Sequence, residues 1–108
     1  MVAQLSVREL KQRLEQGQPT YLVDVRQQWE HERAALPGGV LIPLHELPAR
    51  LDEVEPPEGA LVVCYCHHGV RSLSGAAILE NAGFQGAASL RGGIDAWSME
   101  VDPKVPRY

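Results

Sequence analysis

Cys66 begins a short segment whose residue types suit nucleophilic chemistry. An apolar run, residues 60–65, leads into this thiol, and helix-forming sequence starts at Ser72. A strand, a tight loop and a helix N-terminus are therefore expected around the cysteine. Backbone N–H groups and the positive end of a helix dipole favour a thiolate over a thiol. Because the thiolate is the form that attacks electrophiles, Cys66 is predicted to be the catalytic residue.

The loop after Cys66 is predicted to bind an anion beside the sulfur. A glycine inside the loop lets it curl, so that successive N–H groups point inward and form an anion-binding nest. The arginine adds a permanent positive charge with several donors, and the two histidines add charge when they are protonated. The predicted substrate-binding residues are His67, His68, Gly69, Val70, Arg71 and Ser72.

Strands and helices alternate along the rest of the chain. Apolar runs predict strands, at residues 21–25, 40–42, 61–65 and within 85–90. Apolar residues at helical spacing predict helices, after a capping box at Ser6 and Glu9 and over residues 46–54, 72–81 and 94–99. This alternation predicts an α/β fold, with a mostly parallel sheet and helices on both faces. Ligands of such sheets bind beyond the carboxyl ends of the strands, which is where Cys66 lies.

Length and composition restrict the class of protein. The 108 residues suit one domain, residues 1–108, and the net charge of −4 argues against nucleic acid or a membrane surface as the partner. No apolar run reaches the roughly 20 residues that span a bilayer, and the first residues do not resemble a signal peptide, so a cytoplasmic location is expected. Cys64 and Cys66 are poorly spaced for a mutual disulfide and are expected to be reduced.

The motifs, taken in order, resemble those of the rhodanese family of sulfurtransferases. Residues 66–72 are similar to the family's active-site loop, and residues 24–26 to its Asp-x-Arg motif. The turn and strand at residues 37–43 and the Leu-x-Gly-Gly-x-x-x-Trp run at residues 90–97 also match. At residues 34–36 the chain has Ala-Ala-Leu where the family often has Gly-His-Ile, and we expect only a local change there. The resemblance covers essentially the whole chain and implies a rhodanese-like domain with a five-stranded central sheet.

The resemblance also implies a reaction. The Cys66 thiolate attacks the outer sulfur of thiosulfate or a related donor, sulfite leaves, and the resulting persulfide passes its sulfur to a thiophilic acceptor. Arg71, with His67 or His68, is then expected to bind the sulfonate oxygens of the donor, while the loop N–H groups hold the persulfide. Asp24 and Arg26 are expected to support the site without taking part in the chemistry. The expected partners are a small sulfur donor and a thiol or protein acceptor, the protein is expected to be a monomer, and neither a cofactor nor a metal is required.

Two other functions use the same loop. A Cys-loop phosphatase or arsenate reductase would need an arginine six positions after the cysteine, whereas Arg71 lies five positions after Cys66. A non-catalytic sulfur-carrier or interaction module needs the same loop as the enzyme, and the sequence does not separate the two.

Four residues near these motifs have simpler interpretations. Cys64 lies within a strand and is expected to be a core thiol, and Trp97 is expected in the core. His31 and His45 are expected at the surface. A zinc site at the Cys-x-Cys-His-His run is disfavoured, because neighbours on a chain converge poorly on one ion.

Overall fold

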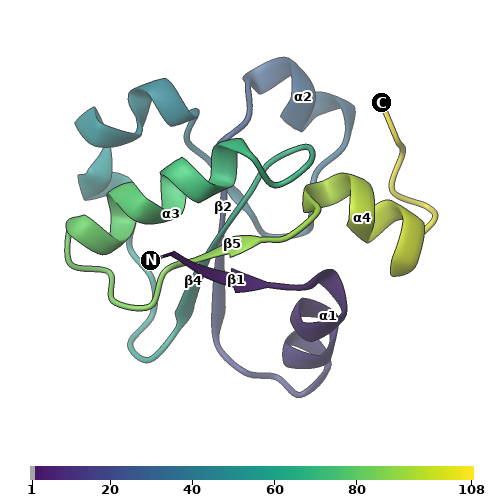
Figure 1. Cartoon of the computed structure of the whole chain (residues 1–108), viewed down its shortest axis with the longest axis horizontal. Helices are drawn as coiled ribbons and strands as arrows, with labels where there is room; N and C mark the ends of the chain where they lie inside the picture. The colour runs from purple at the N-terminus through teal and green to yellow at the C-terminus, as the bar shows by residue number, and fades with distance from the viewer. Residues whose placement is uncertain (1) are drawn as a thin grey trace.

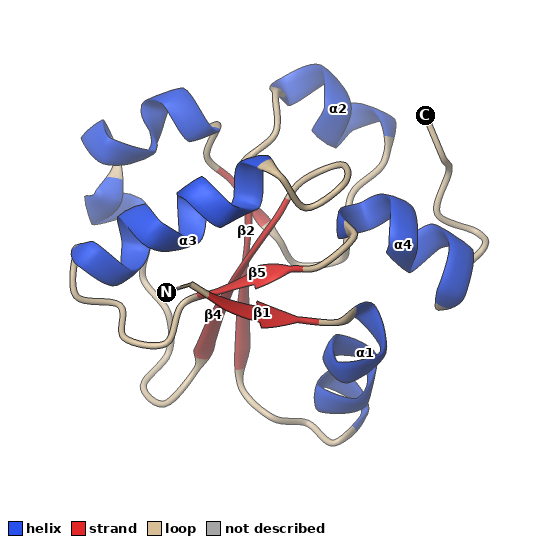
Figure 2. Ribbon diagram, in the orientation of Figure 1, coloured by secondary structure: helices blue, strands red, loops and turns tan. Residues whose placement is uncertain are grey.

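The computed structural model describes residues 2–108 and is built on a five-stranded sheet in which all strands run parallel (Figure 2). The strands are β1 (Ala3–Leu5), β2 (Thr20–Asp24), β3 (Val40–Leu41), β4 (Leu61–Tyr65) and β5 (Ala88–Leu90). Their order across the sheet is β1-β5-β4-β2-β3, so β4, which leads into Cys66, is the central strand. The predicted α/β fold with a parallel sheet is confirmed.

Helices cover both faces of the sheet, as predicted (Figure 1). The α-helices are α1 (Val7–Glu15), α2 (Gln28–Arg33), α3 (Arg71–Asn81) and α4 (Gly93–Glu100), and two 3₁₀ helices are η1 (Leu44–Ala49) and η2 (Leu51–Glu53). Figure 1 shows α3 with the two 3₁₀ helices on one face and α1 with α4 on the other. The predicted capping box is present, since the Ser6 hydroxyl accepts from the Glu9 N–H and the Glu9 carboxylate accepts from the Ser6 N–H.

The alternation of side chains along β4 divides the core in two. Val63 and Tyr65 belong to the cluster that packs against α1 and α4, which includes Leu10, Ile94 and Trp97. Val62, Cys64 and Cys66 point to the opposite face and join the cluster under α3 and η1. Successive residues of a strand face opposite sides of the sheet, which explains why both cysteines lie on the α3 side.

Two details of the secondary structure differ from the sequence prediction. The helix expected over residues 46–54 is wrong: the segment forms two 3₁₀ helices with a break at Arg50. Pro48 lacks the N–H that an α-helix would direct to the Leu44 carbonyl, so the tighter turn is favoured. The sequence does not predict the edge strand β1, because the strand is three residues long and its first two residues are exposed. Its pairing with β5 defines it.

Residues 101–108 lie against the body of the protein. Val101, Val105 and Tyr108 pack on the α1 and α4 side of the core, and the Ser98 hydroxyl donates to the Val105 carbonyl.

Within residues 2–108, no helix combines the length and the apolar character needed to cross a bilayer.

Candidate active site

The Cys66 sulfur faces the N–H groups of its own loop. The Gly69 N–H donates to Sγ at 3.2 Å and the Ser72 N–H at 3.4 Å. The Sγ also lies 3.4 Å from the Ser72 hydroxyl, which is held at 2.7 Å by the hydroxyl of Ser89 on β5. Cys66 is only 1% exposed, so these three polar contacts replace most of the water around the sulfur. Inward-facing amides of this kind stabilise negative charge on sulfur.

Gly69 gives the loop its curl. Its φ of +93° lies in the region that favours glycine. A Cβ at this position would lie 2.9 Å from the Gly92 nitrogen and 3.1 Å from the Leu90 carbonyl oxygen. The loop backbone therefore approaches the turn after β5 too closely for any side chain.

Gly93 lets α4 approach the start of the Cys66 loop. The N–H groups of Ile94 and Asp95, in the first turn of α4, donate to the carbonyls of Cys66 and His67 at 2.9 and 3.1 Å. A Cβ on Gly93 would overlap both of these carbonyl oxygens. The Gly-Gly pair of the sequence motif thus lets α4 pack directly against the start of the Cys66 loop.

Arg71 forms a two-pronged ion pair with a residue that the sequence did not single out. Its Nη1 and Nη2 donate to Oε1 and Oε2 of Glu30, on α2, at 2.6 and 2.8 Å. The hydrogen bond from Arg71 is the main cause that lowers the pKa of Glu30 to about 2, and Glu30 in turn raises the pKa of Arg71. The one available signal was the position of Glu30 three residues after Gln27, typical of a helix cap.

Asp24 and Arg26 form a fully buried pair at the end of β2. The Arg26 Nε and Nη2 donate to Asp24 at 2.8 and 2.7 Å, and Nη2 also donates to the Ala34 carbonyl at 2.6 Å. His31 Nδ1 lies 2.8 Å from Asp24. The expectation that His31 is a plain surface residue is therefore wrong, since this contact leaves it half-buried. These bonds brace the segments that lead to α2 and to residues 34–36.

Tyr108 joins the two ion pairs, and sequence reasoning also missed it. Its hydroxyl accepts from Arg26 Nη1 at 2.7 Å and donates to Glu30 Oε2 at 2.9 Å. Burial raises the pKa of Tyr108 to about 12, so its proton is retained at neutral pH. A continuous polar chain results, which runs from Asp24 through Arg26, Tyr108 and Glu30 to Arg71. No sequence motif marks Tyr108, because its contacts depend on the path of residues 101–108.

The two histidines of the loop stack on the tyrosine. The His67 ring lies 3.9 Å from the Tyr108 ring at 10° and 3.9 Å from the His68 ring at 23°. Burial, followed by the charge of His68, lowers the pKa of His67, which favours the neutral ring. Within residues 2–108, the His67 Nε2 is buried with no hydrogen-bond partner. Val70, by contrast, is 73% exposed at the rim of the loop.

Cys64 and Trp97 are core residues, as predicted. Cys64 is completely buried, and this burial raises the pKa of its thiol to about 12. Its Sγ lies against Gly75 of α3, and neither cysteine is in a disulfide. In the part of the chain that the structure describes, no group of three or more His, Cys, Asp or Glu side chains could hold a metal ion.

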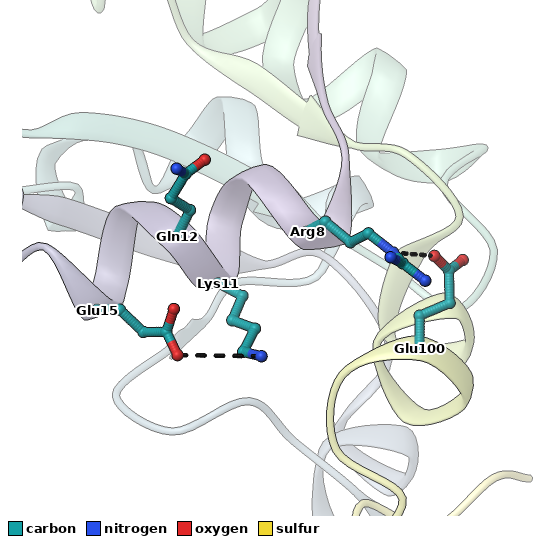
Figure 3. Close-up of a pocket in the computed structure, with 5 residues that line it drawn as sticks. All are labelled: Arg8, Lys11, Gln12, Glu15 and Glu100. Atoms are coloured by element: carbon teal, nitrogen blue, oxygen red, sulfur yellow. Dashed lines mark hydrogen bonds and ion pairs between the residues drawn. The ribbon is translucent and has the colours of Figure 1, made fainter.

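A hollow away from Cys66 lies at the surface between α1 and α4 (Figure 3). Arg8 pairs with Glu100 at 3.2 Å and Lys11 with Glu15 at 3.9 Å, and both pairs are exposed. Figure 3 shows Gln12 as the remaining side chain of this hollow. Exposed pairs of this kind are weak and mutually neutralised, and we assign the hollow no chemistry.

Comparisons with known proteins agree with this geometry. Residues 6–100 match the family model described as Rhodanese-like domain. A protein named sulfurtransferase from Allochromatium vinosum is 36% identical over 97% of this chain and 96% of its own length. The probable adenylyltransferase/sulfurtransferase MoeZ of Mycobacterium tuberculosis is 34% identical over 96% of this chain, which spans only 26% of that larger protein.

A solved structure of a rhodanese-like protein is similar to this chain along nearly its whole length. The crystal structure of a rhodanese-like domain protein from Staphylococcus aureus is 30% identical, with a TM-score of 0.79 over 89% of this chain and 91% of that one. The family match, the sulfurtransferase names of the relatives and the two amide N–H groups on the Cys66 sulfur all indicate sulfur transfer as the general activity. The chain belongs to the rhodanese-like domain family.

Proposed function

We propose that this protein is a thiosulfate sulfurtransferase that works through a persulfide on Cys66. The observation that carries the proposal is the pair of inward N–H groups, from Gly69 and Ser72, on the Cys66 sulfur. The thiolate attacks the outer sulfur of thiosulfate, the sulfur–sulfur bond of the donor breaks, and sulfite leaves with the bonding electron pair. Cys66 then carries the transferred sulfur as a persulfide anion, which the loop amides stabilise. A thiophilic acceptor attacks that outer sulfur and regenerates the thiolate.

Arg71 is proposed to bind the sulfonate oxygens of the donor, with His67 or His68 beside it. A guanidinium has five N–H donors, and the bonds to Glu30 use one hydrogen on each of Nη1 and Nη2. Donor hydrogens therefore remain for an anion. Asp24 and Arg26 are proposed to act only as supports, because both are fully buried and bonded to protein groups.

The acceptor in the cell is proposed to be a thiol, free or on a protein, and the location to be the cytoplasm. Two unpaired cysteines, one of them the proposed nucleophile, fit a reducing compartment. A sulfur carrier that passes its persulfide to one partner protein is the alternative, and it rests on the same loop. The relative MoeZ combines the names adenylyltransferase and sulfurtransferase in one longer protein.

The test is to treat the protein with thiosulfate and locate the added sulfur by mass spectrometry. We expect a gain of about 32 Da on Cys66, and thiocyanate on addition of cyanide. Hydrolysis of p-nitrophenyl phosphate is measured alongside. Phosphatase turnover with neither added sulfur nor thiocyanate would refute the proposal. Slow release to cyanide but fast release to a partner protein would favour the carrier.

A further inference from the structure

Tyr108 is connected to the Cys66 loop in two independent ways, one direct and one through Glu30. Its hydroxyl lies between the two ion pairs, 2.7 Å from Arg26 Nη1 and 2.9 Å from Glu30 Oε2. Its ring lies flat on the ring of His67, the residue that follows Cys66. The ring contacts His67 directly, and the hydroxyl is linked to Arg71 through the Glu30 carboxylate. One side chain is therefore connected to both residues that flank the donor in the proposed reaction.

The hydroxyl completes the coordination of the Glu30 carboxylate. Oε1 accepts from Arg71 Nη1 at 2.6 Å and from the Gln27 N–H at 3.0 Å. Oε2 accepts from Arg71 Nη2 at 2.8 Å and from the Tyr108 hydroxyl at 2.9 Å. Each oxygen therefore has one bond to Arg71 and one bond that fixes its own position. Because the Arg71 side chain is 37% exposed, a carboxylate that loses one of these fixed bonds lets the guanidinium turn toward solvent.

The Tyr108 ring orients His67, whose Nε2 has no hydrogen bond to hold it. That atom is buried and has no partner within residues 2–108. The orientation of the His67 ring is therefore set by its neighbours in the stack, Tyr108 on one side and His68 on the other. The Trp29 ring also lies edge-on to Tyr108, with the ring centroids 5.9 Å apart.

We propose that Tyr108 is a positioning residue for sulfur transfer, which acts on Arg71 through Glu30 and on His67 through its ring. The inference rests on the proposed function, because Arg71 and His67 matter only if an anionic donor approaches Cys66. In this role Tyr108 touches neither the donor nor the sulfur. It keeps the Arg71 charge beside the thiol and the His67 ring in place.

The test compares three variants. Tyr108→Phe removes the hydroxyl and keeps the ring, Tyr108→Leu removes both, and Tyr21→Phe is the matched control. The Tyr21 hydroxyl also makes two hydrogen bonds, to the Glu53 carbonyl and from the Glu55 N–H, on the remote end of the sheet. Thermal unfolding of each variant confirms that it is folded.

The first readout is the alkylation of Cys66 by anionic iodoacetate relative to neutral iodoacetamide, which reports positive charge at the sulfur without any sulfur transfer. We expect this ratio to fall about threefold in Tyr108→Phe and to stay unchanged in Tyr21→Phe. The second readout is thiosulfate turnover, for which we expect KM to rise about fivefold with kcat within twofold in Tyr108→Phe. Tyr108→Leu, which also frees His67, should lower kcat as well.

A double-variant comparison tests the route through Glu30. In a Glu30→Gln background, adding Tyr108→Phe should change the alkylation ratio no further. An equal fall in both backgrounds, or an unchanged ratio and KM in Tyr108→Phe alone, would overturn the role of Tyr108. If the wild-type protein forms no persulfide, the proposed function fails, and the alkylation ratio still decides whether Tyr108 positions Arg71.

Discussion

The interior of β4 and the loop after it hold two thiols, two residues apart, in opposite chemical surroundings. Cys64 is packed between strand and helix, and its burial raises the pKa of its thiol to about 12. Cys66 is equally buried, yet two N–H groups point at its sulfur. Burial alone therefore does not distinguish the core thiol of Cys64 from the proposed nucleophile, Cys66. The two thiols differ in the polar groups that replace water around the sulfur.

The same contrast explains what the surrounding elements contribute. Around Cys64 the neighbours are apolar side chains and Gly75, whose lack of a Cβ lets α3 approach the strand. Around Cys66 the neighbours are backbone donors, and the glycines that permit them lie in the loop and at the start of α4.

The strongest test of this contrast exchanges each sulfur for oxygen. Cys66→Ser should lower thiosulfate–cyanide turnover at least about 1,000-fold, because a serine hydroxyl is far less ionised than a thiol. Cys64→Ser should keep most of the turnover and lose stability instead, since it places a hydroxyl in an apolar site. Thiocyanate formation and persulfide mass shifts measure both effects. A persulfide found on Cys64 in the Cys66→Ser protein would reverse the assignment.

The next test moves the loop without touching the sulfur. Gly93→Ala introduces a Cβ that overlaps the carbonyls of Cys66 and His67, so the loop must shift away from α4. We expect turnover to fall at least about tenfold and stability by about 3 kcal/mol. Gly17→Ala is the matched control, because its φ of +68° resembles the +62° of Gly93 but nothing lies within 4 Å of its Cβ. If both variants lose the same fraction of turnover, the packing of α4 against the Cys66 loop is irrelevant to catalysis.

The sequence predicted those parts of the fold and site that depend on local patterns. The apolar runs of β2, β3, β4 and β5 and the periodicity of α1, α3 and α4 each correspond to an element of the structure. The Cys66 loop is likewise a contiguous motif, so its position after the central strand followed from alternation and parallel topology.

The parts that the sequence did not predict depend on distant contacts. β1 exists through its pairing with β5. Glu30 and Tyr108 become site residues only because α2 and residues 101–108 converge on the loop. The pairing of Arg71 with Glu30 follows from the same convergence, which no spacing along the chain encodes.

A substitution of Arg71 is expected to have a smaller and more specific effect than Gly93→Ala. Arg71→Ala should raise the KM for thiosulfate about tenfold, since it removes the proposed ligand of the sulfonate. It should also destabilise the protein, because Glu30 is left buried beside Tyr108 without its main partner. Adding Glu30→Gln should restore stability but not the KM. Recovery of both in the double variant would mean that Arg71 has only a structural role.

The smallest expected effect is the pH dependence that Glu30 confers on stability. Its pKa is lowered from an ordinary 4.5 to about 2, chiefly by the hydrogen bond from Arg71. A carboxyl whose pKa is lower in the folded state stabilises the fold above pH 4.5, and this contribution is lost as the pH falls toward 2. Since Arg71 is partly exposed, we expect a contribution of about 2 kcal/mol.

Urea unfolding at pH 6 and pH 3 should show a smaller loss of stability in Glu30→Gln than in the wild type. The exposed Glu58→Gln should behave like the wild type. Equal pH slopes in Glu30→Gln and the wild type would show that the Arg71 pair, unlike the Cys66 loop it adjoins, is energetically neutral.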